Sequence, residues 1–420
     1  MIQTIQLLPG ITLRCFPDSR FKQGTLSLQL VRPMDKTENA LNALLPAVLL
    51  RGCARYPDLR AITHRLDALY GAAVGAVVRR VGDYQTTGLS CGFMEDRFAL
   101  EGDQVLSPML EFLGQLLLEP DLENGVFRTD YLESEKRNLI FSIESQRNDK
   151  RVYAGARLTE LMCKADSFGI PRLGTVEQVQ AITAQTLYDH YRKVLRESPM
   201  ELFYIGSAQA ETVAALLRPI LETIPRAPIS LPPQTSFRDG GKGDHTEQMD
   251  VAQGKLCMGL VTPVTLRDPG FVAMQVFNTL FGSGMINKLF MQIREKMSLC
   301  YDIGSGYHGS KGILTVSAGI DSSQKDLVIR EVLRQLENCC RGDITQEELT
   351  SAKESLISQL RATHDSPAAI EGYYATASLS GLTMTPADYR RAVENVTRED
   401  VMAAAASVQL HTVFFLKGVQ

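Results

Sequence analysis

The sequence predicts an α+β protein made of two homologous modules, each a mainly antiparallel sheet packed against helices. Three observations support this fold class. Strands rich in β-branched and aromatic residues cluster near the ends of each half, and amphipathic helices fill the chain between them. A segment rich in Pro and Gly divides the chain into parts of similar length. The two parts then show the same landmarks in the same order, which indicates an internal repeat.

The dividing segment is predicted to be a linker at residues 227–244. Pro, Gly and Ser are frequent there, and apolar residues follow neither a helical nor a strand period. The linker separates an N-terminal module, residues 1–226, from a C-terminal module, residues 245–420. Because such a composition leaves backbone exposed, proteolysis is expected to cut the native chain first in this segment.

The landmarks of the repeat are strands and capped helices. Each half opens with an apolar strand that ends in Val-x-Pro, GTLSLQLVRP at residues 24–33 and GKLCMGLVTP at residues 254–263, and a helical run follows each strand. Each half closes with a short helix that leads into a strand, at residues 201–206 and 411–418. Thr397 is the predicted N-cap of the second closing helix. These parallels favour duplication, although strand–helix–strand patterns also arise by chance.

The stretches between these landmarks have apolar residues at helical spacing. Helices are predicted at residues 106–118, 131–144, 327–336 and 347–360. Strands are fewer than helices and are clustered, as expected for a sheet covered by helices.

Composition narrows the class of protein. The 420 residues have a net charge of −4 and are 44% hydrophobic, which is ordinary for a globular protein and indicates neither nucleic acid nor a membrane as partner. The chain starts without a basic and then apolar leader and has no apolar run long enough to span a membrane, so a cytoplasmic location is expected. The eight cysteines are scattered without a C-x-x-C pair, which predicts reduced and mostly buried thiols.

The histidines exclude a zinc motif on a single helix. No two of the six histidines lie four residues apart, so neither H-E-x-x-H nor H-x-x-E-H is present, and only a site assembled from distant histidines remains. The stretch at residues 304–309 matches G-x-G-x-x-G, but an alternating strand follows it instead of a helix. It is therefore interpreted as a glycine-rich turn between strands and not as a dinucleotide site.

One segment of the second half carries a family resemblance. FGSGMINKLFMQIREKMSLCYDIGSGY, at residues 281–307, resembles the second-module signature of the M16 zinc peptidases, which are insulinase-, pitrilysin- and mitochondrial-processing-peptidase-like. Arg294 and Tyr301 match the family's arginine and tyrosine that reach substrate at the zinc site of the opposite module. The resemblance implies the LuxS/MPP-like metallohydrolase fold, with two modules arranged as a clamshell.

The first module departs from the family at its metal site. Where the family has H-x-x-E-H, this chain has Ala43-Leu-Leu-Pro-Ala47, so Ala43 and Ala47 replace the ligands and Pro46 replaces the general base. The third ligand would fall near Ser142, and Glu144 would face elsewhere. The resemblance therefore implies a non-catalytic member without metal or cofactor. Pro46 also lacks an N–H, so its helix is expected to start late or to kink.

Another stretch, at residues 51–78, resembles a bacterial M16-like subgroup whose genes typically accompany a catalytically intact member. Some members of that subgroup carry labels linking them to the modification of elongation factor P, but no residue of this chain argues for that link.

Three functional hypotheses follow. The chain is a pseudo-peptidase subunit that pairs with an active M16 zinc peptidase homologue and supplies Arg294 and Tyr301 to a peptide substrate. Alternatively, it is a stand-alone peptide-binding or scaffold protein, with a homodimer as one form in isolation, or an enzyme that uses unrelated residues. The two site residues discriminate between the first two hypotheses, because a purely structural role would make them a surface ion pair and a core tyrosine.

Overall fold

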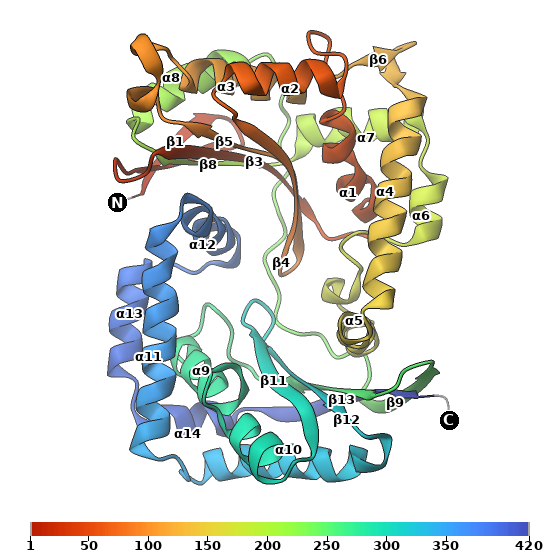
Figure 1. Ribbon diagram of the computed structural model, residues 1–420, viewed down its shortest axis with the longest axis vertical. Helices are drawn as coiled ribbons and strands as arrows, with labels where there is room; N and C mark the ends of the chain where they lie inside the picture. Colours follow the sequence, from red (N-terminus) through yellow and green to blue (C-terminus); the bar gives the residue numbers. More distant parts are fainter. Residues whose placement is uncertain (1, 419–420) are drawn as a thin grey trace. The chain divides into compact units, whose positions relative to one another are not determined.

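The computed structural model describes residues 2–418, and the chain forms two compact units (Figure 1). Unit 1 comprises Met1–Glu144, Pro171–Pro233 and His364–Thr376. Unit 2 comprises Ser145–Ile170, Gln234–Thr363 and Ala377–Gln420. Each unit is built around one sheet that is covered by helices, as predicted for an α+β protein.

The sheet of unit 1 has six strands. Their spatial order is β1 (Gln3–Leu8), β2 (Ile11–Pro17), β8 (Met200–Gly206), β3 (Gln23–Pro33), β5 (Tyr84–Met94) and β4 (Ala73–Val81). Only β2 and β8 run parallel among these neighbours. The helices of this unit's sequence segments are α1 (Asn39–Leu49), α2 (Leu59–Ala68), α3 (Leu106–Leu118), α4 (Thr129–Asn148, whose last turn belongs to unit 2), α6 (Val176–Ala181), α7 (Ala184–Glu197) and α8 (Ala210–Leu221).

Strand periodicity places the core of unit 1 on one face of this sheet. Leu26, Leu28 and Leu30 alternate along β3 and are buried against the helices in one large apolar cluster. Because successive strand residues point to opposite faces, Ser27 and Gln29 lie on the other face.

The sheet of unit 2 repeats the same topology. Its order is β11 (Cys300–His308), β12 (Ile313–Ile320), β10 (Gly254–Val261), β13 (Gln409–Gly418) and β9 (Gly243–Met249), with β13 and β9 parallel. Without β1, the order β2-β8-β3-β5-β4 in unit 1 corresponds to β9-β13-β10-β12-β11 in unit 2, with the parallel pair in the same place. This correspondence supports the predicted duplication. The other helices of unit 2 are α9 (Phe271–Asn278), α10 (Lys325–Cys340), α11 (Gln346–Ala362), α13 (Pro386–Asn395) and α14 (Arg398–Ala406).

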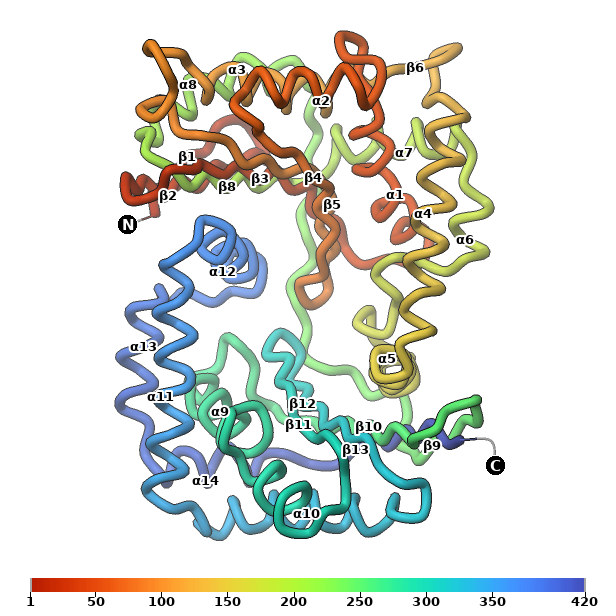
Figure 2. The backbone as a smooth tube through the Cα atoms, in the orientation of Figure 1, coloured from red at the N-terminus to blue at the C-terminus, as the bar shows by residue number. Residues whose placement is uncertain are grey.

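The two units exchange one helix each. Helix α5 (Lys150–Met162) comes from the first half of the chain but packs on β10 and β13 of unit 2. Residues 364–376, with most of helix α12 (Pro367–Ser380), come from the second half but belong to unit 1. Figure 2 allows the path of the backbone through both helices to be followed. The boundaries at residues 226 and 245 remain a prediction about the repeated modules, and the compact units do not follow them at these two helices.

The segment between the modules has no helix or strand over residues 225–242, but it is held at several points. In unit 1, the N–H of Ala227 donates to the carbonyl of Arg196 over 2.9 Å. In unit 2, the N–H of Phe237 donates to the carbonyl of Lys311 over 2.9 Å, and the N–H of Arg238 donates to Asp166 Oδ2 over 2.9 Å. Cleavage in the linker therefore requires that these hydrogen bonds open first.

Most predicted elements are confirmed. The strands predicted at residues 24–33, 254–263, 201–206 and 411–418 are β3, β10, β8 and β13, and the four predicted helices lie within α3, α4, α10 and α11. The side chain of Thr397 caps α14. The glycine-rich residues 304–309 lie mostly inside strand β11 and not in a turn, but β12 follows them and no helix does. All eight cysteines are free, and seven are buried. Over residues 2–418, no helix combines the length and apolar character needed to cross a membrane.

Candidate functional site

Helix α1 holds the positions where the family has its zinc motif. Ala43, Pro46 and Ala47 follow the i, i+3, i+4 spacing that places three residues on one face of a helix. Ala43 and Pro46 are buried, whereas other α1 residues form the apolar core of unit 1. Those core residues are Ala40, Leu44, Leu45, Val48 and Leu49. The helix thus keeps a second face for a site, but that face carries only methyl groups and a proline ring.

Pro46 neither delays nor ends α1, which begins at Asn39 and continues to Leu49. The expectation of a late start is therefore wrong. A residue with an N–H at position 46 would donate to the carbonyl of Asn42, and proline leaves that acceptor unpaired. In this structure the hydroxyl of Thr87, on β5, donates to the Asn42 carbonyl over 2.6 Å. A side chain from the sheet thus replaces the missing hydrogen bond of the helix.

A buried polar network lies beside this helix. His190, on α7, contacts Asn42 Oδ1 through Nε2 over 2.7 Å. The Asn42 amide nitrogen donates to Gln85 Oε1 over 3.0 Å, so Asn42 Oδ1 is an acceptor and Nε2 of His190 carries the proton. Gln85 in turn donates to the carbonyls of Asn39 and Arg172 over 3.1 and 2.8 Å. No local sequence pattern indicates this network, because its members are far apart along the chain.

Burial controls the charge of His190. The side chain is 5% exposed, and burial lowers its pKa to about 4. Glu38 raises this pKa, while Arg32 and Lys193 lower it further. The imidazole is therefore neutral at pH 7, with amide groups as its partners. One imidazole among amides does not constitute a metal site, because zinc needs several His, Cys or carboxylate ligands.

The position of the third ligand does not complete a site. Ser142 lies exposed on α4, and its hydroxyl donates to the carbonyl of Asn138 in the same helix over 2.9 Å. Glu144 is also exposed. Within residues 2–418, no three His, Cys, Asp or Glu side chains gather as a candidate metal site. The residues present do not fit the family's zinc ion, so no hydrolytic step can be assigned to this unit.

The family segment of the second half is built from two π-helical turns. They are η4 (Thr279–Ser283), which continues α9, and η5 (Phe290–Lys296). π-Helical turns are rare and occur often at functional sites. Gly282 lets η4 approach strand β11 closely, since a Cβ at this residue would lie 2.6 Å from the Ser305 hydroxyl. That hydroxyl donates to Asn278 Oδ1 over 2.7 Å and fixes the turn to the sheet.

Arg294 lies in η5 with its guanidinium over the ring of Phe290, 4.8 Å from the ring centroid. Its side chain is 43% exposed, and its contact with Glu295 is loose, 3.7 Å from Nε to Oε1. A long contact between exposed neighbours contributes little to stability. The guanidinium is therefore available to a ligand.

Tyr301 lies at the start of β11, at an irregularity of the sheet. Cys300 pairs with Ile320 and Asp302 pairs with Gly319, so Tyr301 is the extra residue of a β-bulge. Bulges redirect side chains, and Tyr301 is 71% exposed. Ser298, between the two site residues, has φ of 53°, and its N–H donates to the carbonyl of Arg294 over 3.1 Å. The structure thus places Arg294 and Tyr301 at the two ends of one tight turn.

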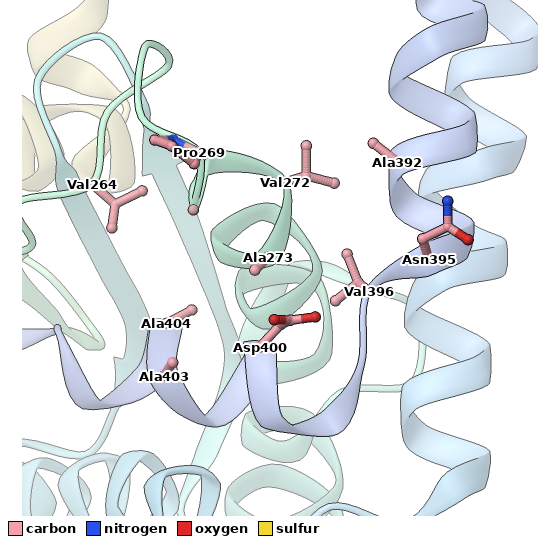
Figure 3. A pocket seen from close by; sticks show the side chains of 11 residues that line it. Val264, Pro269, Val272, Ala273, Ala392, Asn395, Val396, Asp400, Ala403 and Ala404 are labelled. Carbon is pink, nitrogen blue, oxygen red and sulfur yellow. The ribbon is translucent and has the colours of Figure 1, made fainter.

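A separate pocket lies away from both regions. It has a volume of about 580 Å³ and is formed in unit 2 by the loop before α9 and by α9, α13 and α14 (Figure 3). Figure 3 shows mainly alanine and valine side chains, with Asn395 and Asp400 as polar side chains among them. The Asp400 carboxylate already accepts from the N–H of Thr397, in the capping box of α14. The pocket therefore offers mainly apolar surface, and its one carboxylate already caps a helix.

The fold and the altered helix together define a class: a two-unit α+β protein with the architecture of a metallopeptidase and no metal ligands on its zinc helix. Comparison with known proteins agrees. The family model for the peptidase M16 inactive domain matches residues 181–356. A Bacillus subtilis protein named probable inactive metalloprotease YmfF is 28% identical over 98% of this chain and 96% of its own length. An uncharacterised zinc protease of Streptomyces coelicolor is 28% identical over 58% of this chain and 55% of that protein.

Solved structures agree as well. A conserved protein from Enterococcus faecalis superposes with a TM-score of 0.91 at 27% identity, covering 100% of this chain and 99% of that one. A peptidase M16 inactive domain from Pseudomonas fluorescens has a TM-score of 0.83 at 18% identity, covering 100% and 98%, and shows the shared fold. Over nearly its whole length the chain is therefore similar to inactive members of the M16 peptidase family, and residues 181–356 match that family's inactive-domain model.

Proposed function

We propose that this chain is a non-catalytic subunit that pairs with an active M16 zinc peptidase homologue and binds the peptide substrate through Arg294 and Tyr301. One observation supports the pairing most directly. Tyr301 lies in a β-bulge and is 71% exposed, so its hydroxyl can reach a ligand, and it is not the core residue that a structural role would predict. A cytoplasmic location is part of this proposal.

The chemistry of the two side chains suits a peptide. A guanidinium presents a planar set of donors to a peptide carbonyl or carboxylate. A tyrosine hydroxyl can donate to an oxyanion that develops during hydrolysis in the partner's zinc site. The chain itself holds no metal in this proposal, because α1 carries alanine and proline at the ligand and base positions.

A second candidate is a stand-alone peptide-binding or scaffold protein. Strand β4 favours it, because β4 is the last strand of its sheet and pairs on one side, with β5. An extended peptide can add to such an edge through main-chain hydrogen bonds without being hydrolysed. This role would need neither Arg294 nor Tyr301.

The test is peptidase activity of the chain reconstituted with an active M16 homologue. Removing one transition-state donor typically costs 10²–10³ in rate, so Tyr301→Phe or Arg294→Ala is expected to lower turnover by roughly that factor. Gel filtration checks assembly, and metal analysis of the chain alone is expected to find no stoichiometric zinc. Arg341→Ala is the matched control, because Arg341 is 73% exposed and pairs only with Glu337 on its own helix. Unchanged turnover in both site variants would favour the scaffold.

A further inference from the structure

The second face of the unit 1 sheet carries a cluster of hydrogen-bond donors. Ser27 and Gln29 project from β3 on the face opposite to the core. The strand register places Gln29 beside Gly88 of β5, and Gly88 beside Val77 of β4. Arg79, two residues along β4, shares this face. Because Gly88 has no side chain, no group of β5 stands at that position between the donors of β3 and Arg79.

These three donors converge on one carboxylate. Glu371 Oε1 accepts from Ser27 Oγ over 2.6 Å, from Gln29 Nε2 over 2.8 Å and from Arg79 Nη1 over 2.9 Å. Gln29 Nε2 also lies 3.2 Å from Ser27 Oγ and donates to it, which leaves the hydroxyl proton for the carboxylate. Donors held by rigid strands and by one another form a prearranged site for an anion.

The carboxylate belongs to the part of helix α12 that lies in unit 1, residues 367–376, although the chain before residue 364 and after residue 376 lies in unit 2. Glu371 is the only charged residue in the sequence PAAIEGYYATASLS of α12 and is 3% exposed. Its neighbours Ile370 and Ala375 are buried against Phe203 and Ile205 on the same sheet face. A buried charge is unfavourable unless it is paired. The donors on the sheet face provide that pairing for the Glu371 carboxylate.

We propose that Ser27, Gln29 and Arg79 form a carboxylate-binding site for acidic peptides, and that α12 is an internal ligand that occupies it until a peptide displaces it. The site takes a glutamate flanked by small or apolar residues, as α12 itself presents. This site goes beyond the proposed pairing with a peptidase and depends on neither Arg294 nor Tyr301.

The test uses the full-length chain alone and a fluorescently labelled synthetic peptide with the sequence of residues 366–380. In the wild-type chain, α12 fills the site and the peptide is expected to bind weakly. Glu371→Gln removes the charge that pairs with Arg79, so α12 is expected to be displaced more easily and the peptide to bind at least tenfold tighter. The double variant Glu371→Gln/Arg79→Ala is expected to lose that gain. A peptide with Gln in place of its Glu is expected to bind the Glu371→Gln chain at least tenfold more weakly than the acidic peptide.

Hydrogen exchange gives a second readout. The amides of α12 are expected to exchange at least tenfold faster in Glu371→Gln than in wild type, while those of α3 stay unchanged. Glu354→Gln, an exposed glutamate of α11, is the control and is expected to change neither binding nor exchange. Should Glu371→Gln fail to fold, Ser27→Ala removes one neutral donor and is expected to raise α12 exchange severalfold. Equal binding of the acidic and Gln peptides, or α12 exchange that none of these variants changes, would overturn the proposal.

Discussion

The two exchanged helices are similar in length, 13 residues in α5 and 14 in α12, but they are attached in different ways. Helix α5 buries Ala154, Leu158 and Met162, each at most 1% exposed, in apolar clusters of unit 2. Helix α12 buries Ile370 and Ala375 against the unit 1 sheet, and its charged residue Glu371 accepts hydrogen bonds from the same sheet.

Residues next to α5 add further contacts that attach this helix to unit 2. Asp166, a few residues beyond the helix, pairs with Lys311 over 2.9 Å, and the two side chains are 1% and 0% exposed. Gly259 on β10 leaves room for Met162, since a Cβ at this glycine would lie 2.4 Å from the Met162 sulfur. Helix α5 is therefore a permanent part of the core of unit 2. Helix α12 differs because, beside its apolar contacts, a buried carboxylate joins it to hydrogen-bond donors of the sheet.

The largest expected effect comes from the buried ion pair beside α5. Asp166→Asn leaves the Lys311 ammonium without its counter-charge in a site that excludes water, and breaking such a pair typically costs about 3–5 kcal/mol. Urea denaturation of the full chain is expected to show a loss of this size. A loss below about 1 kcal/mol would show that α5 is attached as loosely as α12.

A matched pair of truncations compares the two helices directly. Leu158→Ala removes a buried side chain from α5 and is expected to lower the free energy of unfolding by about 2–5 kcal/mol. Ile370→Ala removes a similar volume from α12, but its cost cannot exceed the free energy that docks the helix, because α12 can open locally. Urea denaturation is expected to show the smaller loss for Ile370→Ala, with α12 amides exchanging faster. Equal global losses in both variants would contradict the comparison.

Mild acid is expected to weaken unit 1 first. Burial lowers the pKa of His190 to about 4, whereas an unfolded histidine titrates near 6.5. The unfolded state therefore binds the proton first, and stability is full above pH 6.5 and falls by roughly 3 kcal/mol as the pH decreases to 4. The measurement is thermal unfolding of wild type and His190→Gln across this range. The variant is expected to lose less stability, and parallel curves would rule out a neutral buried imidazole.

Stronger acid is expected to weaken the attachment of α5, with the smallest effect of the series. Burial raises the pKa of Glu247 on β9, but hydrogen bonds from Arg157 and Tyr153 of α5 lower it more, so the net pKa lies below its ordinary value. The stability from these contacts is present above pH 4.5 and is lost as the pH falls through the lowered pKa, by about 1 kcal/mol. Glu247→Gln is expected to flatten this part of the stability curve, and hydrogen exchange of α5 localises the change.

Sequence periodicity predicted the strands and helices but not their partners. The alternation in β3 and the apolar spacing of α3 are local signals, and both predicted the correct secondary structure. The apolar spacing of helix α5 likewise indicates which of its faces is apolar. That pattern does not indicate that the apolar face packs on the sheet of the other half of the chain. Helix α12 has its apolar residues all around the helix, so its single inward carboxylate could not be identified from spacing.

The sequence is informative about the candidate site where one residue type decides the chemistry. The absence of histidine and glutamate at positions 43, 46 and 47 is visible in the sequence, and the structure adds no ligand there. Of the two effects expected from Pro46, a late start or a kink, the late start is wrong, and the partner that replaces the missing hydrogen bond, Thr87, lies on a distant strand. The exposure of Tyr301 depends on a bulge that leaves no local sequence signal.

The exchange of helices also has a consequence for synthesis on the ribosome. Helix α5 emerges before any strand of the sheet on which it packs, so its apolar face must remain uncovered while more than half of unit 2 is translated. Unit 1, although it contains the N-terminus, lacks its last helix until residue 376 has been made. Neither half of the gene encodes a complete unit, so fragments divided at the linker would each expose a surface that only the other fragment can cover.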